Sequence, residues 1–297
     1  MLNGSLVKTI TSDGLEHTGF WMDQKSDTAV FHTHGTAGDF YTHKFVEVEG
    51  EQLASRKISF LTANNRGHDV YADIRKHNGE QIDWTQIGGA YEIFEESLLD
   101  IGVWVEFLSD RGVKKIILQG HSLGPNKNIY YQYKKQDLRI LGFIHLSPQN
   151  DAGLMRHKFG QKKYDEVNKM IHKKLQEGKG REMLPDEYIE VCPISVQGYS
   201  GYFIEDGVGN LFPYHNPHNP NWNIVRSIKE PQLLIFGQKD PYITPSVPDA
   251  VTIFRSKAKN PSLLTSKIID DASHSFVGYE KELVDEIIKW IKRGNLA

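Results

Sequence analysis

The feature of the sequence that most constrains the fold is a pentapeptide, Gly-His-Ser-Leu-Gly, at residues 120–124. The preceding residues 114–119 read Lys-Lys-Ile-Ile-Leu-Gln, a short run with β-branched apolar side chains that is typical of a buried parallel strand. Pro125 follows the pentapeptide, where a first helical turn tolerates a missing N–H. The pattern therefore predicts a strand, a sharp turn and a helix, with Ser122 in the turn.

This strand, turn and helix form the context of a nucleophile elbow, in which glycines stand two positions before and after the serine. The strand and the helix pack closely at such a turn, and little room is left for a Cβ at either glycine. Gly-x-Ser-x-Gly also arises often by chance, so the alternative is an ordinary Gly/Ser turn. If Ser122 is a nucleophile, the rest of the chain must supply a base, an acid and an oxyanion hole.

Composition excludes several classes of function. The chain has 35 basic and 38 acidic residues and a formal net charge of −3, so we expect neither nucleic acid nor a membrane as a partner. Cys192 is the only cysteine, and neither an internal disulfide nor a cysteine-based zinc site can be built. No signal-peptide pattern or apolar run of about 18 residues occurs, so we expect a cytoplasmic protein that acts on a small molecule.

Apolar runs and amphipathic stretches alternate along the rest of the chain. Two runs, 6–10 and 15–22, flank a turn and predict an antiparallel hairpin at one edge of a sheet. Buried strands are predicted at 29–32, 58–63, 140–146, 231–237 and 264–269. Helices are predicted at about 40–55, 91–108 and 283–291, and a surface excursion at 68–88. We therefore expect an α/β fold with a doubly wound, mostly parallel β-sheet.

The composition changes over residues 150–228, where charged helical pieces alternate with loops rich in aromatic residues, proline and asparagine. An insertion of this length between core strands is most simply a lid. We therefore expect a core in two parts, residues 1–149 and 229–297, with the lid at 150–228.

The predicted lid carries more aromatic surface than a solvated insertion could leave exposed. Aromatic faces pack well against apolar acyl or ring groups, so some of these rings are expected to line a substrate pocket, among them Tyr202, Phe212 and Tyr214. The alternative is that the rings only attach the lid to the core. The many Asn, His and Tyr side chains favour a partly polar pocket, and short acyl or polar aromatic substrates over long-chain lipids.

Two loops that follow predicted strands carry further candidates, since ligands of such sheets bind at the carboxyl ends of the strands. Asp240 follows the run 231–237, and His274 follows the run 264–269. With Ser122 they give the chain order Ser, Asp, His that belongs to the α/β-hydrolase arrangement.

Other carboxylates remain alternatives for the acid. Asp240 lies in a Lys-Asp-Pro turn, where aspartate is also common for reasons of turn chemistry alone. Asp151 follows the run 140–146 and could take its place. Asp270 and Asp271 are less favoured because they would crowd His274.

Over essentially its whole length the chain resembles the α/β-hydrolase superfamily, in its lid-bearing serine esterase, lipase and thioesterase branch. The resemblance rests on four motifs in the expected order: His34-Gly35-Thr36, Gly-His-Ser122-Leu-Gly, Gly-x-x-Asp240 and Ser-His274. One departure is Pro125-Asn126-Lys127, where many members carry small residues; it indicates a polar subgroup.

The arrangement gives each candidate a role. His274 would accept the proton of Ser122 during attack, and Asp240 would hold the imidazole tautomer. The backbone N–H groups of Leu123 and Thr36 would stabilise the oxyanion.

Other histidines occur in pairs, His32 with His34 and His215 with His218, but no carboxylate accompanies them at a zinc-enzyme spacing. We therefore expect no metal site, and a structural or substrate-shaping role for these side chains, with His34 a candidate substrate-binding residue. No phosphate-binding glycine motif follows a predicted strand, so no nucleotide cofactor is expected.

The sequence therefore predicts a serine hydrolase that cleaves a small carboxylic ester or thioester through an acyl-enzyme, without a cofactor. Two alternatives remain open. One is an acyltransferase that passes the same acyl group to an alcohol or amine, and the other is a ligand receptor that kept the pocket without turnover.

Overall fold

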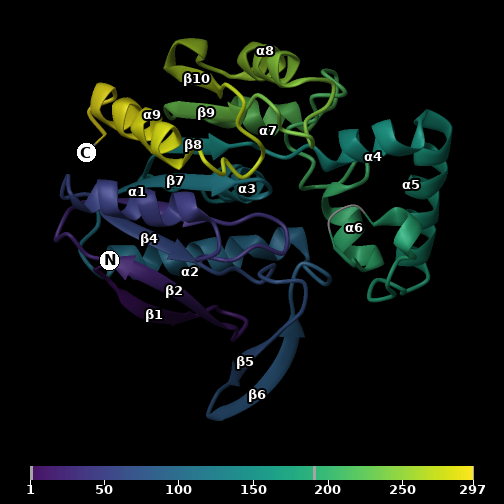
Figure 1. The fold of residues 1–297 in the computed structure, drawn as a ribbon. Helices are drawn as coiled ribbons and strands as arrows, with labels where there is room; N and C mark the ends of the chain where they lie inside the picture. Colours follow the sequence, from purple (N-terminus) through teal and green to yellow (C-terminus); the bar gives the residue numbers. More distant parts are fainter. Residues whose placement is uncertain (1–2, 190–191, 297) are drawn as a thin grey trace.

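The computed structural model describes residues 3–189 and 192–296, which fold around one eight-stranded sheet of order β1-β2-β4-β3-β7-β8-β9-β10 (Figure 1). The strands are β1 (Ser5–Ile10), β2 (Glu16–Met22), β3 (Thr28–Thr33), β4 (Ser59–Ala63), β7 (Lys115–His121), β8 (Ile140–Leu146), β9 (Gln232–Gly237) and β10 (Leu264–Ile269). Strands β1 and β2 pair in the antiparallel sense, as does β2 with β4, and all the other pairs are parallel. The predicted doubly wound, mostly parallel sheet is confirmed.

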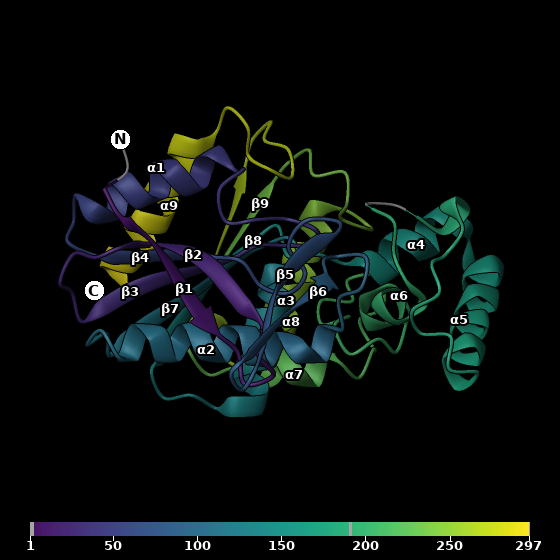
Figure 2. The ribbon, with the colours of Figure 1, turned by 90° about the horizontal axis from the view of Figure 1, so that it is seen from below.

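Helices cover both faces of this sheet (Figure 2). One face carries α1 (Lys44–Ala54) and α9 (Glu280–Arg293), and the other carries α2 (Ser97–Ser109), α3 (Gly124–Lys135), α7 (Trp222–Ser227) and α8 (Val247–Lys257). The centre of strand β7 is apolar because it is buried on both faces: Ile116 and Leu118 enter one core, whereas Ile117 enters the other. A strand buried on both faces cannot alternate with polar residues.

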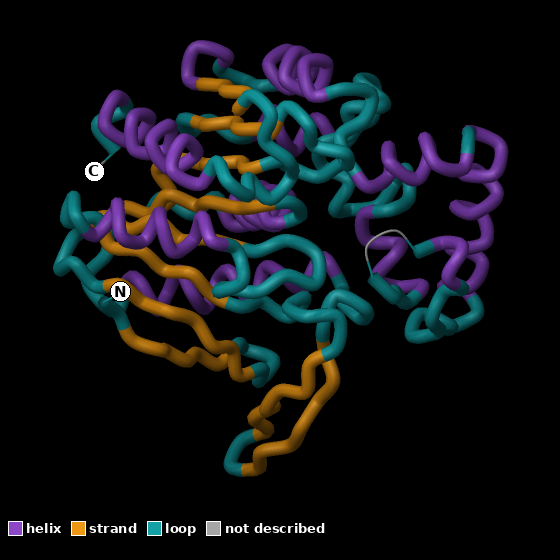
Figure 3. The backbone as a smooth tube through the Cα atoms, in the orientation of Figure 1, coloured by secondary structure: helices purple, strands orange, loops and turns teal. Residues whose placement is uncertain are grey.

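A second, two-stranded sheet projects from the body as a hairpin of β5 (Ala72–Asn78) and β6 (Gln81–Ile87) (Figure 3). The sequence predicted only a surface excursion over this stretch. Gly79 begins the two-residue loop of the hairpin with a φ of 66°. Gly79, at the first position of this loop, is the local signal that would have revealed the turn.

The long segment between β8 and β9 divides into two parts. Helices α4 (Asp151–Phe159), α5 (Gln161–Gln176) and α6 (Val196–Tyr202) form a group beside the sheet, at the right of Figure 1. The chain then returns to the body, where α7 packs against α3 and α8. Short 3₁₀ turns complete the described elements at Phe94–Glu96, Asp186–Tyr188 and Pro261–Leu263. No helix in residues 3–189 and 192–296 combines the length and the apolar character needed to cross a bilayer.

A buried ion pair joins α3 to the loop before α2. Lys127 Nζ lies 2.6 Å from Glu92 Oε1, and neither side chain is exposed to solvent. The same ammonium donates to Asn65 Oδ1 at 3.0 Å, and the backbone N–H of Asn65 donates to His34 Nε2 at 3.1 Å. Lys127 therefore ties together the loops that follow β3 and β4 and the helix that follows Ser122.

We expect Lys127→Met to lower the free energy of unfolding by about 3–5 kcal/mol, because it leaves the Glu92 carboxylate buried without a cation. The double variant Lys127→Met/Glu92→Leu should recover most of this loss, since it removes both charges. Urea unfolding measures both values. Lys135→Met, at an exposed position of the same helix, is the control and should change stability by less than about 0.5 kcal/mol. A single variant as stable as the wild type would contradict the expectation.

Candidate active site

Ser122 lies in the turn between β7 and α3, with a φ of 61°. This left-handed conformation is costly for a residue with a side chain, and it is typical of strained turns at functional sites. The neighbouring glycines are required by packing. A Cβ on Gly120 would lie 2.3 Å from the backbone nitrogen of Pro125, and one on Gly124 would lie 2.2 Å from the carbonyl oxygen of Thr33.

The loops after β9 and β10 bring Asp240 and His274 together. His274 Nδ1 lies 2.8 Å from Asp240 Oδ2, and the Asp240 side chain is fully buried. The backbone N–H of Tyr242 donates to the other carboxylate oxygen at 3.0 Å. An imidazole that donates from Nδ1 to this carboxylate keeps Nε2 as an acceptor.

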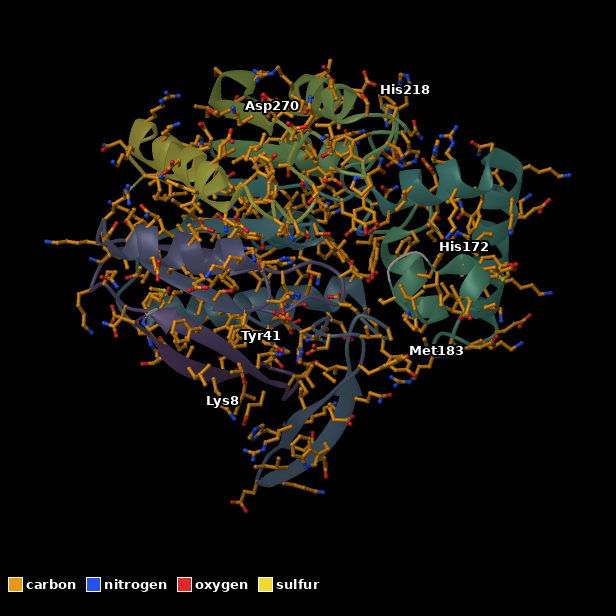
Figure 4. All side chains as sticks on the ribbon, in the orientation of Figure 1. Lys8, Tyr41, His172, Met183, His218 and Asp270 are labelled. Atoms are coloured by element: carbon orange, nitrogen blue, oxygen red, sulfur yellow. The ribbon has the colours of Figure 1, made fainter. Side chains whose placement is uncertain are left out.

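The alternative acids lie elsewhere. Asp151 Oδ1 accepts a hydrogen bond from Gln149 Nε2. Asp271 forms an exposed ion pair with Lys239 at 2.7 Å, and Asp270 lies at the outer surface (Figure 4). Among the four carboxylates considered from the sequence, Asp240 is therefore the one that contacts His274.

Ser122 and His274 line one cavity of about 170 Å³. The complete lining is Gly35, Thr36, Gly38, His43, His121, Ser122, Gln149, Tyr242, His274 and Ser275. Most of these residues present polar atoms. The volume is below the range of about 300–1,000 Å³ that is common for drug-sized ligands, so the cavity suits a small group.

In the described part of the chain no hydrogen bond joins Ser122 to His274. The Ser122 hydroxyl donates instead to Gln149 Oε1, at 3.2 Å. For proton transfer, the Ser122 hydroxyl must turn from Gln149 toward the imidazole of His274. Catalytic hydrogen bonds are often long or absent before a substrate binds, so this arrangement does not disqualify the pair.

The loop after β3 packs directly on the turn that carries Ser122. A Cβ on Gly35 would lie 2.6 Å from the Cβ of Ser122 and 3.1 Å from the backbone nitrogen of Leu123. Thr36 is the next residue and lines the cavity. Neither Thr36 nor Leu123 donates its backbone N–H to an acceptor within residues 3–189 and 192–296. Leu123 also lies at the N-terminus of α3, where the helix dipole favours negative charge.

One protein-family model and many solved structures match this chain. A family model described as "Protein of unknown function (DUF1749)" matches residues 94–292, more than half of the chain. The chain belongs to this family. No curated protein matches the sequence.

Solved structures similar to this DUF1749 member share its fold at low identity. An esterase of Pyrococcus furiosus is 18% identical with a TM-score of 0.62, over 98% of this chain and 91% of that one. Est1E from Butyrivibrio proteoclasticus, bound to ferulic acid, is 15% identical with a TM-score of 0.66, over 97% and 98%. An α/β-hydrolase-fold protein of unknown function is 14% identical with a TM-score of 0.70, over 99% and 97%. This family member therefore has the α/β-hydrolase fold.

Two further histidines of this DUF1749 member stand beside His274. His121 Nε2 donates to the carbonyl oxygen of His274 at 2.8 Å, which holds the backbone of the loop after β10. Burial, followed by the nearby imidazole of His274, holds the pKa of His121 well below its ordinary value. Burial also lowers the pKa of His43, whose ring lies 4.8 Å from that of His121. Both rings are therefore neutral at pH 7.

The other paired histidines do not gather around a metal. The described residues contain no group of three or more His, Cys, Asp or Glu that could hold one. His32 is hydrogen-bonded to Gln119 at 3.0 Å, and burial lowers the pKa of His32 to about 3. His215 lies between Glu205 and Asn150, and His218 is exposed (Figure 4).

The structure does not bring the four predicted substrate-binding residues to the cavity. His34 is fully buried and accepts from the Asn65 backbone, and burial, then the Lys127 ammonium, holds its pKa well below the ordinary value. Tyr202 packs beside Phe94, with ring centroids 6.5 Å apart.

The two remaining rings also fill the interior. Phe212 stacks on Phe254 at 5.5 Å, and Tyr214 meets Phe236 edge to face at 6.1 Å. Large rings yield the most free energy when they are removed from water completely, and the space between the inserted segment and the sheet allows this.

The sequence analysis did not single out five cavity residues, which are Gly38, His43, Gln149, Tyr242 and Ser275. Gln149 follows β8 by three residues and Tyr242 lies two residues after Asp240. Both therefore stand in loops at the carboxyl ends of strands, and that position was the available signal. His43 precedes α1 and carries no comparable local mark.

Proposed function

We propose that this protein is a serine hydrolase that cleaves a small carboxylic ester or thioester through an acyl-enzyme, with Ser122 as the nucleophile. One observation carries the proposal. Ser122, in a left-handed turn, lines the same cavity as His274, and Nδ1 of His274 contacts the buried carboxylate of Asp240. A nucleophile, a base and a group that orients the base are the parts that acyl transfer needs.

The first half of the reaction forms the acyl-enzyme. Ser122 Oγ attacks the carbonyl carbon, its proton passes to His274 Nε2, and the carbonyl π electrons move onto the oxygen. When the tetrahedral intermediate collapses, the C–O or C–S bond to the leaving group breaks. The leaving alcohol or thiol takes the proton from His274.

Water completes the turnover by the same steps in reverse order. It attacks the acyl carbon and gives a proton to His274, and Ser122 leaves with that proton while the carboxylic acid departs. Asp240 supports both halves because a buried carboxylate stabilises the imidazolium and fixes its tautomer.

The oxyanion formed in both halves would be held by the backbone N–H groups of Thr36 and Leu123. Both residues flank Ser122, and Gly35 allows the two backbone segments to approach closely. Losing one such donor costs about 3 kcal/mol of transition-state stabilisation, so this loop contributes strongly to the expected rate.

Two observations support an ester as substrate. The similar structures from Pyrococcus furiosus and Butyrivibrio proteoclasticus include proteins named as esterases, one of them bound to ferulic acid. The cavity is also small, which favours a short acyl group.

The inserted segment, residues 150–228, would act as a lid. Its first helix, α4, starts two residues after Gln149, which lines the cavity. A movement of this helix would change access to Ser122.

Replacing the proposed nucleophile by Ser122→Ala should reduce ester hydrolysis by about 10⁶-fold, because no other group can form the acyl-enzyme. Steady-state kinetics of the purified variant measure the loss, and circular dichroism checks that it is folded. A fluorophosphonate should label wild-type Ser122 and leave the variant unlabelled. Activity that survives, or labelling of another residue, would refute the proposal.

Asp240→Asn should lower kcat by about 10⁴-fold, because an amide no longer favours the imidazole tautomer that accepts from Ser122. Asp151→Asn is the matched control and should cost far less, since Asp151 contacts Gln149 rather than His274. The reverse order of effects would place the acid after β8.

Across p-nitrophenyl esters of increasing acyl length, kcat/KM should be greatest for short chains, because the cavity next to Ser122 measures only about 170 Å³. The comparison starts from acetate and extends to long-chain esters. A maximum at long chains, or activation at a lipid–water interface, would show that the segment opens into a larger acyl site. Added alcohols and amines in the same assay test whether the acyl group passes to a nucleophile other than water.

A further inference from the structure

Gln149 is buried and forms hydrogen bonds through both its backbone and its side chain. Only 4% of the residue is exposed. Its backbone N–H donates to the carbonyl oxygen of Ser122 at 3.0 Å, and its own carbonyl accepts from Asn126 Nδ2 at 3.5 Å. Its side chain is bound at both ends of the amide, by Asp151 on one side and by Ser122 and Thr36 on the other.

These partners fix which way the amide faces. A carboxylate oxygen accepts hydrogen bonds, so the NH₂ group must point to Asp151. The carbonyl Oε1 therefore points to the cavity, where it accepts from Ser122 Oγ at 3.2 Å and from Thr36 Oγ1 at 3.4 Å. A carbonyl oxygen has two lone pairs, and these two hydroxyls occupy both.

The proposed reaction removes one of these two donors. When Ser122 attacks, its proton passes to His274, and Oε1 of Gln149 loses the hydrogen bond that it had in the free protein. Oε1 then keeps only the hydrogen bond from Thr36, which leaves this buried acceptor less well satisfied, and the amide cannot turn its NH₂ group away from Asp151 to compensate. A donor on the bound substrate would restore the hydrogen bond.

We infer that Gln149 Oε1 recognises a hydrogen-bond donor on the carbon next to the scissile carbonyl, so that the preferred substrates are esters of α-hydroxy or α-amino acids. This inference rests on the proposed function, since it assumes that Ser122 attacks an acyl carbon. The position is argued from the free protein, where Oε1 lies 3.2 Å from Ser122 Oγ: once Ser122 attacks an acyl carbon, the substituent on the adjacent carbon is the part of the acyl group that we place within reach of Oε1.

Three ethyl esters separate the donor from other effects: lactate and isobutyrate are equal in size, and 2-methoxypropionate is larger by one methyl group. Lactate carries an α-hydroxyl, 2-methoxypropionate keeps the oxygen without its proton, and isobutyrate has a methyl group instead. The pH-stat gives kcat/KM for each, divided by the rate constant for hydroxide-catalysed hydrolysis of the same ester. We expect the wild type to prefer lactate to 2-methoxypropionate by about 10- to 100-fold after this correction.

Gln149→Met tests whether this preference comes from Oε1, because methionine has a similar length and offers no comparable acceptor. The ratio of lactate to 2-methoxypropionate should fall close to one in this variant. Gln176→Met, at the exposed end of α5, is the control and should keep the wild-type ratio.

The results distinguish a failure of the inference from a failure of the proposed function. Equal rates on the two esters in the wild type, or a preference that survives in Gln149→Met, would overturn the inference. In both cases, hydrolysis of ethyl isobutyrate and fluorophosphonate labelling of Ser122 by the wild type would leave the proposed function standing. If the wild type neither turns over any of the esters nor takes the label, the proposed function itself fails, and the inference with it.

Discussion

The close packing of three backbone segments around Ser122 is the constraint on which the rest of the site depends. Gly35, Gly120 and Gly124 each stand where a Cβ would overlap neighbouring backbone or the Ser122 side chain. Their absence of side chains lets β7 turn sharply into α3 while the loop after β3 lies against the turn. The strained φ of Ser122 is held by this packing, and both proposed oxyanion donors belong to the same tight contact.

A network of buried polar side chains lies beside this contact. Lys127 and Glu92 are completely buried, and the ammonium extends through Asn65 to His34 at the start of the loop that carries Gly35. Buried ion pairs are weak contributors to net stability but need specific geometry, so this network fixes the relative positions of the loops. The polar residues Asn126 and Lys127, which follow the Ser122 turn, are thus explained by the buried hydrogen bonds and the ion pair that they form.

In the segment between β8 and β9, aromatic residues that the sequence suggested for substrate binding are instead buried in the protein interior. Its aromatic rings suggested a pocket lining, and Tyr202, Phe212 and Tyr214 are nevertheless almost completely removed from solvent. Their burial leaves a small cavity beside Ser122, lined by residues from separate loops. We therefore propose that a few hydrogen-bonding groups such as Gln149 select the substrate, rather than an aromatic surface.

The sequence by itself determined the sheet, because strands buried on both faces are made mainly of apolar residues, and it placed Ser122, Asp240 and His274 in loops after strands. Local chemistry sufficed there: glycine spacing, apolar runs and chain order are all written within a few residues. Only the tertiary structure decided that Asp240 rather than Asp151 meets His274, and that Ser122 donates to Gln149 in the free protein. Those contacts join residues that are 27 to 34 positions apart, and their geometry depends on how the loops close over the sheet, which no local pattern encodes.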